Sequence, residues 1–245
     1  MPIIRHVFTA LRIITKPSVL VPNLAVKSVA NINFANLREA GYEGVVIDRD
    51  NCLTKPRQDV LVPSLKDAWS SCLESFPPSR VLIVSNSAGT SKDASFLQAE
   101  ALTRNLGVPV MLHEAPKPWV KRPPTPSAEG VSTDTKPVQP RKVPTPRLVV
   151  IGDRLSTDIV LGARLPKSFS IWTTQVWEEE SAGVRIVRLV EGSVLSAVKG
   201  WRGWRRKRRG LEPEGEPKEF VIDVPVAPQP EKKSMVEFCP ISSSK

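Results

Sequence analysis

Several features that would place this chain in a special structural class are missing from its sequence. No stretch approaches the ~18 uninterrupted apolar residues that a membrane-spanning helix needs, so we expect no such helix. Only 3 of the 245 residues are cysteine, too few and too scattered for a disulfide framework or a zinc site. A reduced compartment such as cytosol, nucleus or mitochondrial matrix is therefore expected. The hydrophobic share of 40% excludes a fully disordered chain.

Acidic residues are absent from the first 38 positions, which hold five basic ones. If this segment is wound as a helix, Arg5, Arg12 and Lys16 fall within about 40° of one another, with apolar side chains opposite. Such a basic amphipathic segment is typical of mitochondrial transit peptides and of interfacial membrane anchors, although an ordinary surface helix can share the pattern. We expect residues 1–29 to serve in targeting or membrane docking.

The chain is instead rich in proline, with 24 residues, and in positive charge, with a formal net charge of +10. The charge predicts attraction to phosphate-bearing partners, either nucleic acid or an anionic lipid surface. Residues 121–146 are expected to form a disordered proline-rich insertion, and residues 196–245 a disordered tail, first basic and then rich in proline and glutamate. The basic stretch 199–210 fits a membrane interface, single-stranded nucleic acid or a solvated tail.

Between these segments, the sequence alternates short apolar runs with helical patterns, which defines a predicted domain over residues 30–195. This alternation predicts the α/β class, with a Rossmann-like open parallel sheet and helices on both faces. Thr90 and Asp93 are predicted to form a capping box at the second helix. Strands are predicted at 44–48, 80–85, 108–112, 147–153 and 169–172, and helices at 63–76 and 91–107.

Small polar or charged residues follow nearly every predicted strand. In an open parallel sheet, ligands bind beyond the carboxyl ends of the strands, so these residues are expected to converge on one edge. The candidates in chain order are Asp48, Asp50, Ser85, Asn86, Lys117, Asp153 and Asp158.

These residue types suit one kind of chemistry. The carboxylates of Asp48 and Asp50 are close enough to repel, so the pair makes sense beside a divalent cation, and Asp153 could complete a hard-oxygen Mg²⁺ site. Ser85 and the backbone N–H groups after it could hold phosphate oxygens, with Lys117 as a cationic clamp. The set predicts metal-assisted phosphoryl transfer to a carboxylate nucleophile.

The order DxD, Ser, Lys and GDxxxxD resembles the haloacid dehalogenase superfamily of aspartate-nucleophile phosphatases. Within it, the chain is similar to the mitochondrial phosphatidylglycerophosphate phosphatase family, whose lead-in the acid-free stretch 11–34 also resembles. The resemblance covers residues 11–120 and 147–190. It rests on DRDNCLTKP (48–56), SNSAG (85–89), HEAPKP (113–118) and GDRLSTD (152–158).

For this sequence, the resemblance implies that Asp48 attacks the phosphorus and becomes an aspartyl-phosphate. It implies that Asp50 protonates the leaving alcohol and then activates the hydrolytic water. Ser85 would bind the phosphoryl oxygens and Lys117 would stabilise the charged intermediate, while Asn86 is a further candidate for phosphate contact.

The resemblance also implies a Mg²⁺ cofactor, held by Asp153, Asp48 and the backbone carbonyl of Asp50. Asp158 is expected to support this metal site or to orient Lys117.

The stretch from Asp50 to Ser85 is filled by one loop and one predicted helix, and the stretch from Ser85 to Lys117 by one predicted helix and one predicted strand, so no cap domain is expected. An open site suits a phosphate carried on something large. The resemblance implies that phosphatidylglycerophosphate, an anionic phospholipid, is hydrolysed to phosphatidylglycerol in cardiolipin biosynthesis. The enzyme would be peripheral at the matrix face of the inner mitochondrial membrane. The alternatives are a phosphatase of nucleic-acid ends or other phosphomonoesters, or a non-catalytic membrane adaptor on the same fold.

Overall fold

The computed structural model describes residues 15–115, 117–118, 145–177, 182–212 and 215–224. The start of the predicted targeting segment, nearly all of the predicted insertion and the last 21 residues lie outside this part of the chain.

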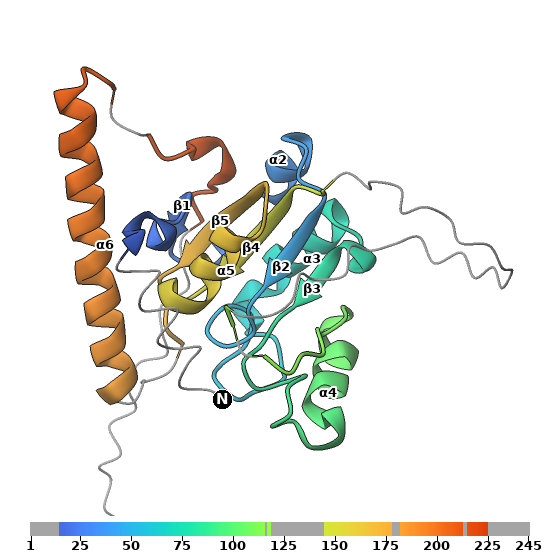
Figure 1. Ribbon diagram of the computed structural model, residues 1–245. Coiled ribbons are helices and arrows are strands. Elements are labelled where there is room, and N and C mark those ends of the chain that lie inside the picture. The colour runs from blue at the N-terminus through green and yellow to red at the C-terminus, as the bar shows by residue number, and fades with distance from the viewer. Residues whose placement is uncertain (1–14, 116, 119–144, 178–181, 213–214, 225–245) are drawn as a thin grey trace, which may run out of the picture.

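A five-stranded parallel sheet forms the centre of the molecule, in the order β1-β5-β4-β2-β3 (Figure 1). The predicted α/β class is therefore confirmed, and the fold is consistent with the haloacid dehalogenase-like architecture that the resemblance implies. Every residue of β2 is buried, as expected for a central strand covered on both faces. The strands are β1 Leu24–Val26, β2 Gly44–Ile47, β3 Val81–Ile83, β4 Leu148–Gly152 and β5 Ser168–Thr173.

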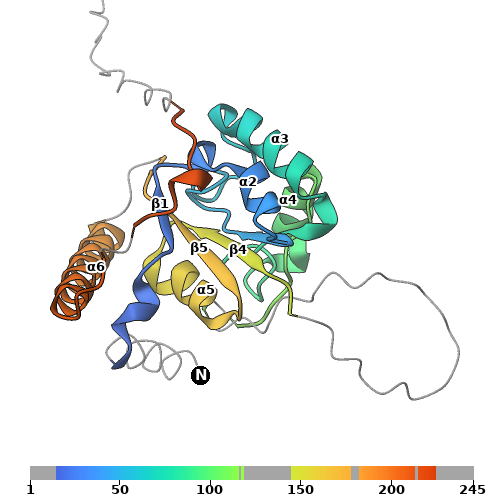
Figure 2. The ribbon, with the colours of Figure 1, turned by 90° about the horizontal axis from the view of Figure 1, so that it is seen from above.

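Helices cover both faces of the sheet. On one face, α2, α3 and α4 contribute to the main hydrophobic core, while α5 packs against the other (Figure 2). A fifth helix, α6, lies outside α5, against the first turn of the described chain (Figures 1 and 2). Among the described helices, none combines the length and hydropathy needed to cross a bilayer. The α-helices are α2 Phe34–Glu39, α3 Lys66–Ser75, α4 Leu97–Leu106, α5 Val160–Arg164 and α6 Ala182–Arg208.

Short helical turns complete the fold and mostly lead into these elements. Within the described residues, six are 3-10 turns, and η6 is a π-helical turn between β4 and α5. The 3-10 turns are η1 Pro17–Leu20, η2 Val29–Asn31, η3 Pro63–Leu65, η4 Pro78–Arg80, η5 Ala94–Phe96 and η7 Lys218–Phe220; η6 spans Leu155–Ile159.

The structure departs from the predicted elements in three places. The run 108–112 is not a full strand, because its pairing with the sheet is the single bridge between Val110 and Ile83. Strand β1 was not predicted, since three apolar residues inside the acid-free segment give little periodic signal. Helix α4 begins at Leu97, later than predicted, yet Asp93 still serves it by accepting hydrogen bonds from the N–H groups of Gln98 and Ala99, both at 2.9 Å.

The predicted disordered tail does not hold for residues 196–208 and 215–224. The first group completes α6, because its inward side chains continue the buried face of that helix. In the second group, the Phe220 ring packs 5.4 Å from Phe169 and 6.3 Å from Tyr42, between ring centroids. The Phe220 carbonyl also accepts a 2.9 Å hydrogen bond from the N–H of Asn33. This segment therefore closes the edge of the main core.

Candidate active site

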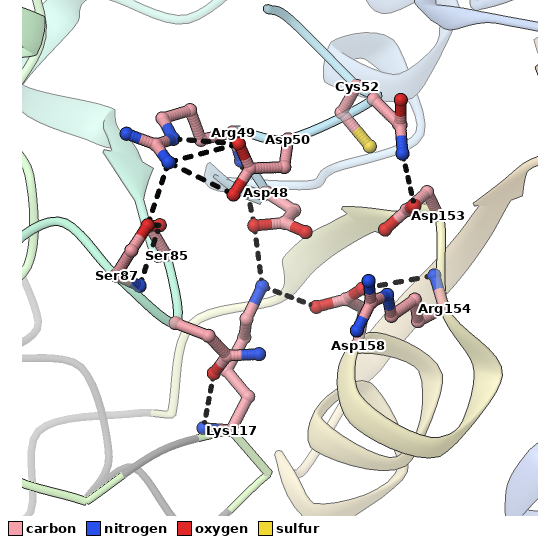
Figure 3. A network of polar contacts seen from close by, with 12 residues as sticks. Asp48, Arg49, Asp50, Cys52, Ser85, Ser87, Lys117, Asp153, Arg154 and Asp158 are labelled. Carbon is pink, nitrogen blue, oxygen red and sulfur yellow. Dashed lines mark hydrogen bonds and ion pairs between the residues drawn. The ribbon is translucent and has the colours of Figure 1, made fainter. Parts of the chain in front are cut away.

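Three buried carboxylates meet at the carboxyl edge of the sheet (Figure 3). Asp48 directly follows β2, Asp153 follows β4, and Asp158 lies on η6. One oxygen from each lies within 4.8 Å of the other two. Neighbouring parallel strands end side by side, so residues more than a hundred positions apart in the chain converge here.

Lys117 joins two of these carboxylates from below in Figure 3. Its Nζ atom lies 2.6 Å from Asp48 Oδ1 and 2.7 Å from Asp158 Oδ1. Burial alone would lower the pKa of Lys117, but the two carboxylates outweigh it and raise that pKa above its ordinary value. The side chain is therefore a fixed cation inside the site.

The negative charge of neighbouring carboxylates helps to raise the pKa of Asp48 and of Asp153. Burial raises the pKa of Asp48 well above its ordinary value; Lys117 opposes this effect, while Asp158 and Asp153 add to it. Burial and Asp158 likewise raise the pKa of Asp153, against the pull of Arg188. Three carboxylates touch two cations, Lys117 and Arg188, so the cluster carries one uncompensated negative charge when fully ionised.

Asp50 lies in the same loop but faces elsewhere. Its carboxylate accepts hydrogen bonds from the Arg49 guanidinium at 3.1 Å and from the backbone N–H of Arg57 at 2.9 Å. Its side chain is 33% exposed, whereas that of Asp48 is 9% exposed. The third member of the buried carboxylate cluster is thus Asp158. The Asp50 carboxylate lies outside that cluster and is partly exposed to solvent.

Arg49 is a site residue that the sequence analysis missed. Its side chain is almost fully buried, and it contacts Asp50, Asp59 at 3.2 Å and the hydroxyl of Ser87 at 2.7 Å. An arginine within a DxD motif gives no sequence signal that it turns inward. The contacts show that Arg49 ties the Asp50 loop to the loop that follows β3.

The loop after β3 brings Ser85 and Asn86 to the same edge. The Ser85 hydroxyl is 3.2 Å from that of Ser87 and accepts a hydrogen bond from the Ser87 N–H at the same distance. The Asn86 side-chain oxygen accepts a 2.9 Å hydrogen bond from the backbone N–H of Lys117. His113 contacts the Ser85 carbonyl through Nε2, at 2.9 Å. Asn86 and His113 therefore fix the segment that carries Lys117.

Gly152 allows Asp158 to reach the cluster. A Cβ atom at position 152 would lie 2.1 Å from the Asp158 Cβ, so only glycine leaves room for that side chain over the end of β4. The backbone N–H of Arg154 donates to Asp158 Oδ2 at 3.2 Å and completes the turn. The chain thus turns back through η6, so that both aspartates of the GDxxxxD motif reach the cluster.

Helix α6 supplies two further residues that the sequence analysis did not assign to the site. Arg188 donates to the Asp153 carboxylate and, at 2.9 Å, to the Asp153 backbone carbonyl. Glu191 is buried and accepts hydrogen bonds from the N–H groups of Leu155 and Ser156, at 3.3 and 3.0 Å. Both contacts hold α6 against the turn that carries Asp158.

The family model and the relatives that match this chain are all named for the same phosphatase. Residues 4–177 match the model of a family described as mitochondrial PGP phosphatase. The mitochondrial phosphatidylglycerophosphatase of Saccharomyces cerevisiae is 30% identical over 162 residues, which cover 66% of this chain and 82% of that protein. No solved structure matches this chain.

Two photosynthetic relatives also match. The chloroplastic phosphatidylglycerophosphate phosphatase 1 of Chlamydomonas reinhardtii is 34% identical over 148 residues, covering 60% of this chain. The chloroplastic/mitochondrial phosphatidylglycerophosphate phosphatase 1 of Arabidopsis thaliana is 31% identical over 197 residues, covering 79%. In both cases the match spans half of the relative's length.

The close approach at Gly152 yields a direct prediction. Replacing it with alanine (Gly152→Ala) should lower the free energy of unfolding by about 2 kcal/mol or more, because Asp158 must leave its place beside Lys117. Urea denaturation followed by circular dichroism measures this. Gly192→Ala is the matched control, since a Cβ on that α6 glycine meets no atom within 4 Å and should leave stability unchanged or raise it. Equal effects of the two substitutions would refute the tight packing at Gly152.

Proposed function

This chain belongs to the mitochondrial PGP phosphatase family, and we propose that it hydrolyses phosphatidylglycerophosphate to phosphatidylglycerol at the matrix face of the inner mitochondrial membrane. The reaction would be a step in cardiolipin biosynthesis. The observation that carries the proposal is the buried cluster of Asp48, Lys117, Asp158 and Asp153 at the edge where a parallel α/β sheet binds ligands. The names of the three relatives support the choice of substrate.

Asp48 is the proposed nucleophile. Its Oδ1 atom is held at 2.8 Å by the Arg49 N–H and at 2.6 Å by Lys117, which fixes the orientation of the carboxylate. An Asp48 oxygen would attack the phosphorus while the bond to the glycerol oxygen breaks, which leaves an aspartyl-phosphate. Lys117, held protonated by its carboxylate partners, would offset the charge on the transferring phosphoryl group.

Asp50 is the proposed proton carrier. Its carboxyl group would give a proton to the departing glycerol oxygen and then take one from the water that attacks the aspartyl-phosphate. That second step releases inorganic phosphate and restores Asp48. The partial exposure of Asp50, and its anchoring by Arg49 and the Arg57 N–H, suit a group that must exchange protons while keeping its place.

Mg²⁺ is the proposed cofactor. The donor set fits a hard dication, because three carboxylates lie within 4.8 Å of one another and retain a negative charge after Lys117 and Arg188 are counted. Asp48 and Asp153, with the Asp50 backbone carbonyl, would hold it. When bound, Mg²⁺ supplies positive charge that brings the phosphate dianion against the Asp48 carboxylate.

We also propose that no cap domain covers the site. Among the described residues, the stretch from Asp50 to Ser85 holds only α3 and β3 with short turns, and the stretch from Ser85 to Lys117 holds only α4 with a short turn. A lipid headgroup held at a membrane surface would reach such a site without a closing domain.

Phosphate release tests the proposal. Turnover of phosphatidylglycerophosphate in detergent micelles should require Mg²⁺, and Asp48→Asn should reduce it about a thousandfold or more while the fold is kept. Asp67→Asn, on the exposed first turn of α3, is the matched control and should retain full activity. A phosphorylated oligonucleotide, run in parallel, should not be hydrolysed.

Two results would count against this proposal. Full turnover by Asp48→Asn would remove Asp48 as the nucleophile. Release from the oligonucleotide but not from the lipid would keep the chemistry and overturn the substrate.

The raised pKa values of Asp48 and Asp153 give a separate prediction about pH. Protons compete with Mg²⁺ for these carboxylates at a higher pH than for ordinary ones, so the affinity for Mg²⁺ should fall as pH drops. Isothermal titration calorimetry from about pH 7.5 down towards the ordinary aspartate range near about pH 4 should show affinity falling by up to about tenfold per unit, with protons released on binding. An affinity that stays flat down to that range would mean that the two carboxylates do not bind the ion.

A further inference from the structure

Helix α6 has an inner face that is anchored to the domain. Buried side chains recur along it at helical spacing, and they include Glu191, Leu195 and Val198. Leu195 packs with η1, η6 and α5, and Glu191 bonds the backbone of η6. The position of the helix along one side of the molecule is therefore set by packing (Figures 1 and 2).

The apolar side chains of α6 extend well beyond this inner face, onto a side where a soluble helix normally carries polar groups. Its exposed residues Ile186, Val190, Ala197, Trp201 and Trp204, here called the outer stripe, fall within about 60° of one another at 100° per residue. Ile186 and Val190 are 60% and 57% exposed, and Trp201 and Trp204 are 51% and 53% exposed. The helix thus has one broad apolar arc, of which the domain covers only part.

The charges of α6 are strongly one-sided. Between residues 182 and 211 the only acid is Glu191, and it is turned inward. The last turns carry a run of exposed cations; the guanidinium of Arg205 lies 4.8 Å from the Trp201 ring centroid, and that of Arg208 lies 4.4 Å from the Trp204 ring centroid. Tryptophan beside arginine on an acid-free helix face is the composition of an interfacial membrane helix.

We propose that α6 docks this protein on an anionic phospholipid bilayer, with the outer stripe inserted at the headgroup level and the basic last turns against lipid phosphates. A nucleic acid would satisfy the cations but leave Ile186 and Val190 without an apolar partner. A second copy of the chain would bring one acid-free cationic helix against another. Only a bilayer with anionic lipid meets both the apolar and the charged parts of this face.

Docking through α6 would also position the candidate active site near the membrane surface. The inner face of the helix carries Arg188, which bonds Asp153, and Glu191, which bonds the turn leading to Asp158. A helix lying in the membrane surface would therefore hold the carboxyl edge of the sheet close to the lipid headgroups. This step rests on the proposed function, whereas the docking itself does not.

Vesicle binding by the full chain tests the proposal. Co-sedimentation should be strong with vesicles of phosphatidylcholine plus phosphatidylglycerol and weak with phosphatidylcholine alone. The double substitution Trp201→Ala with Trp204→Ala should weaken binding about tenfold or more. The triple substitution Arg205→Gln, Lys207→Gln and Arg208→Gln should weaken binding about a hundredfold at low salt.

Matched control variants use similar residues elsewhere on the surface. Phe96→Ala with Leu97→Ala removes exposed apolar side chains near α4, and Lys66→Gln with Lys92→Gln removes exposed cations, so both should bind vesicles normally. Hydrolysis of soluble glycerol 3-phosphate should be equal in the Trp201/Trp204 variant and in the parent chain.

The outcomes separate this inference from the proposed function. Normal vesicle binding by the α6 variants would overturn the docking surface, even if the lipid is hydrolysed. If the α6 variants lose binding to an oligonucleotide but keep binding to vesicles, the docking surface is overturned in favour of a nucleic acid. If they change only the mass measured by analytical ultracentrifugation, it is overturned in favour of a second copy. Lost vesicle binding in the α6 variants supports the docking surface, even where phosphatidylglycerophosphate is not hydrolysed.

Discussion

The Lys117 ammonium lies 2.6 Å from an Asp48 oxygen and 2.7 Å from an Asp158 oxygen, and most of the site is arranged to keep it there. Asn86 holds its backbone, and Gly152 clears the space through which Asp158 reaches it. Burying three carboxylates is costly unless every charge has a partner. Lys117 and Arg188 balance only two of the three negative charges, and the charge that remains is the basis of the proposed Mg²⁺ site.

Helix α6 links this cluster to the outer surface of the protein. Its residues 182–208 lie beyond the segment 4–177 that matches the family model, yet Arg188 and Glu191 reach the same turn as the matched motifs. Helix α6 is therefore an integral part of the domain, and its outer stripe exposes apolar side chains to the surroundings.

The sequence allowed much of the site to be predicted, because catalytic chemistry needs particular residue types directly after particular strands. Strands β2 and β4, and the convergence of Asp48 with Asp153, followed from buried apolar runs that end in acids. The inward turn of Arg49 and the pairing of Arg188 with Asp153 did not, because they depend on tertiary contacts that leave no local pattern. The helical order of residues 196–208 was also missed, since apolar side chains interleaved with a run of cations resemble a solvated basic tail.

The measurement that tests the central claim most directly is chemical trapping of the phosphorylated residue. The chain would be mixed with phosphatidylglycerophosphate and Mg²⁺, quenched with borohydride during turnover, and mapped by peptide mass spectrometry. An acyl phosphate is reduced by borohydride, so Asp48 should be recovered as homoserine, and only when substrate is present. Release of phosphate with Asp48 unchanged, or with the modification on another residue, would contradict the account.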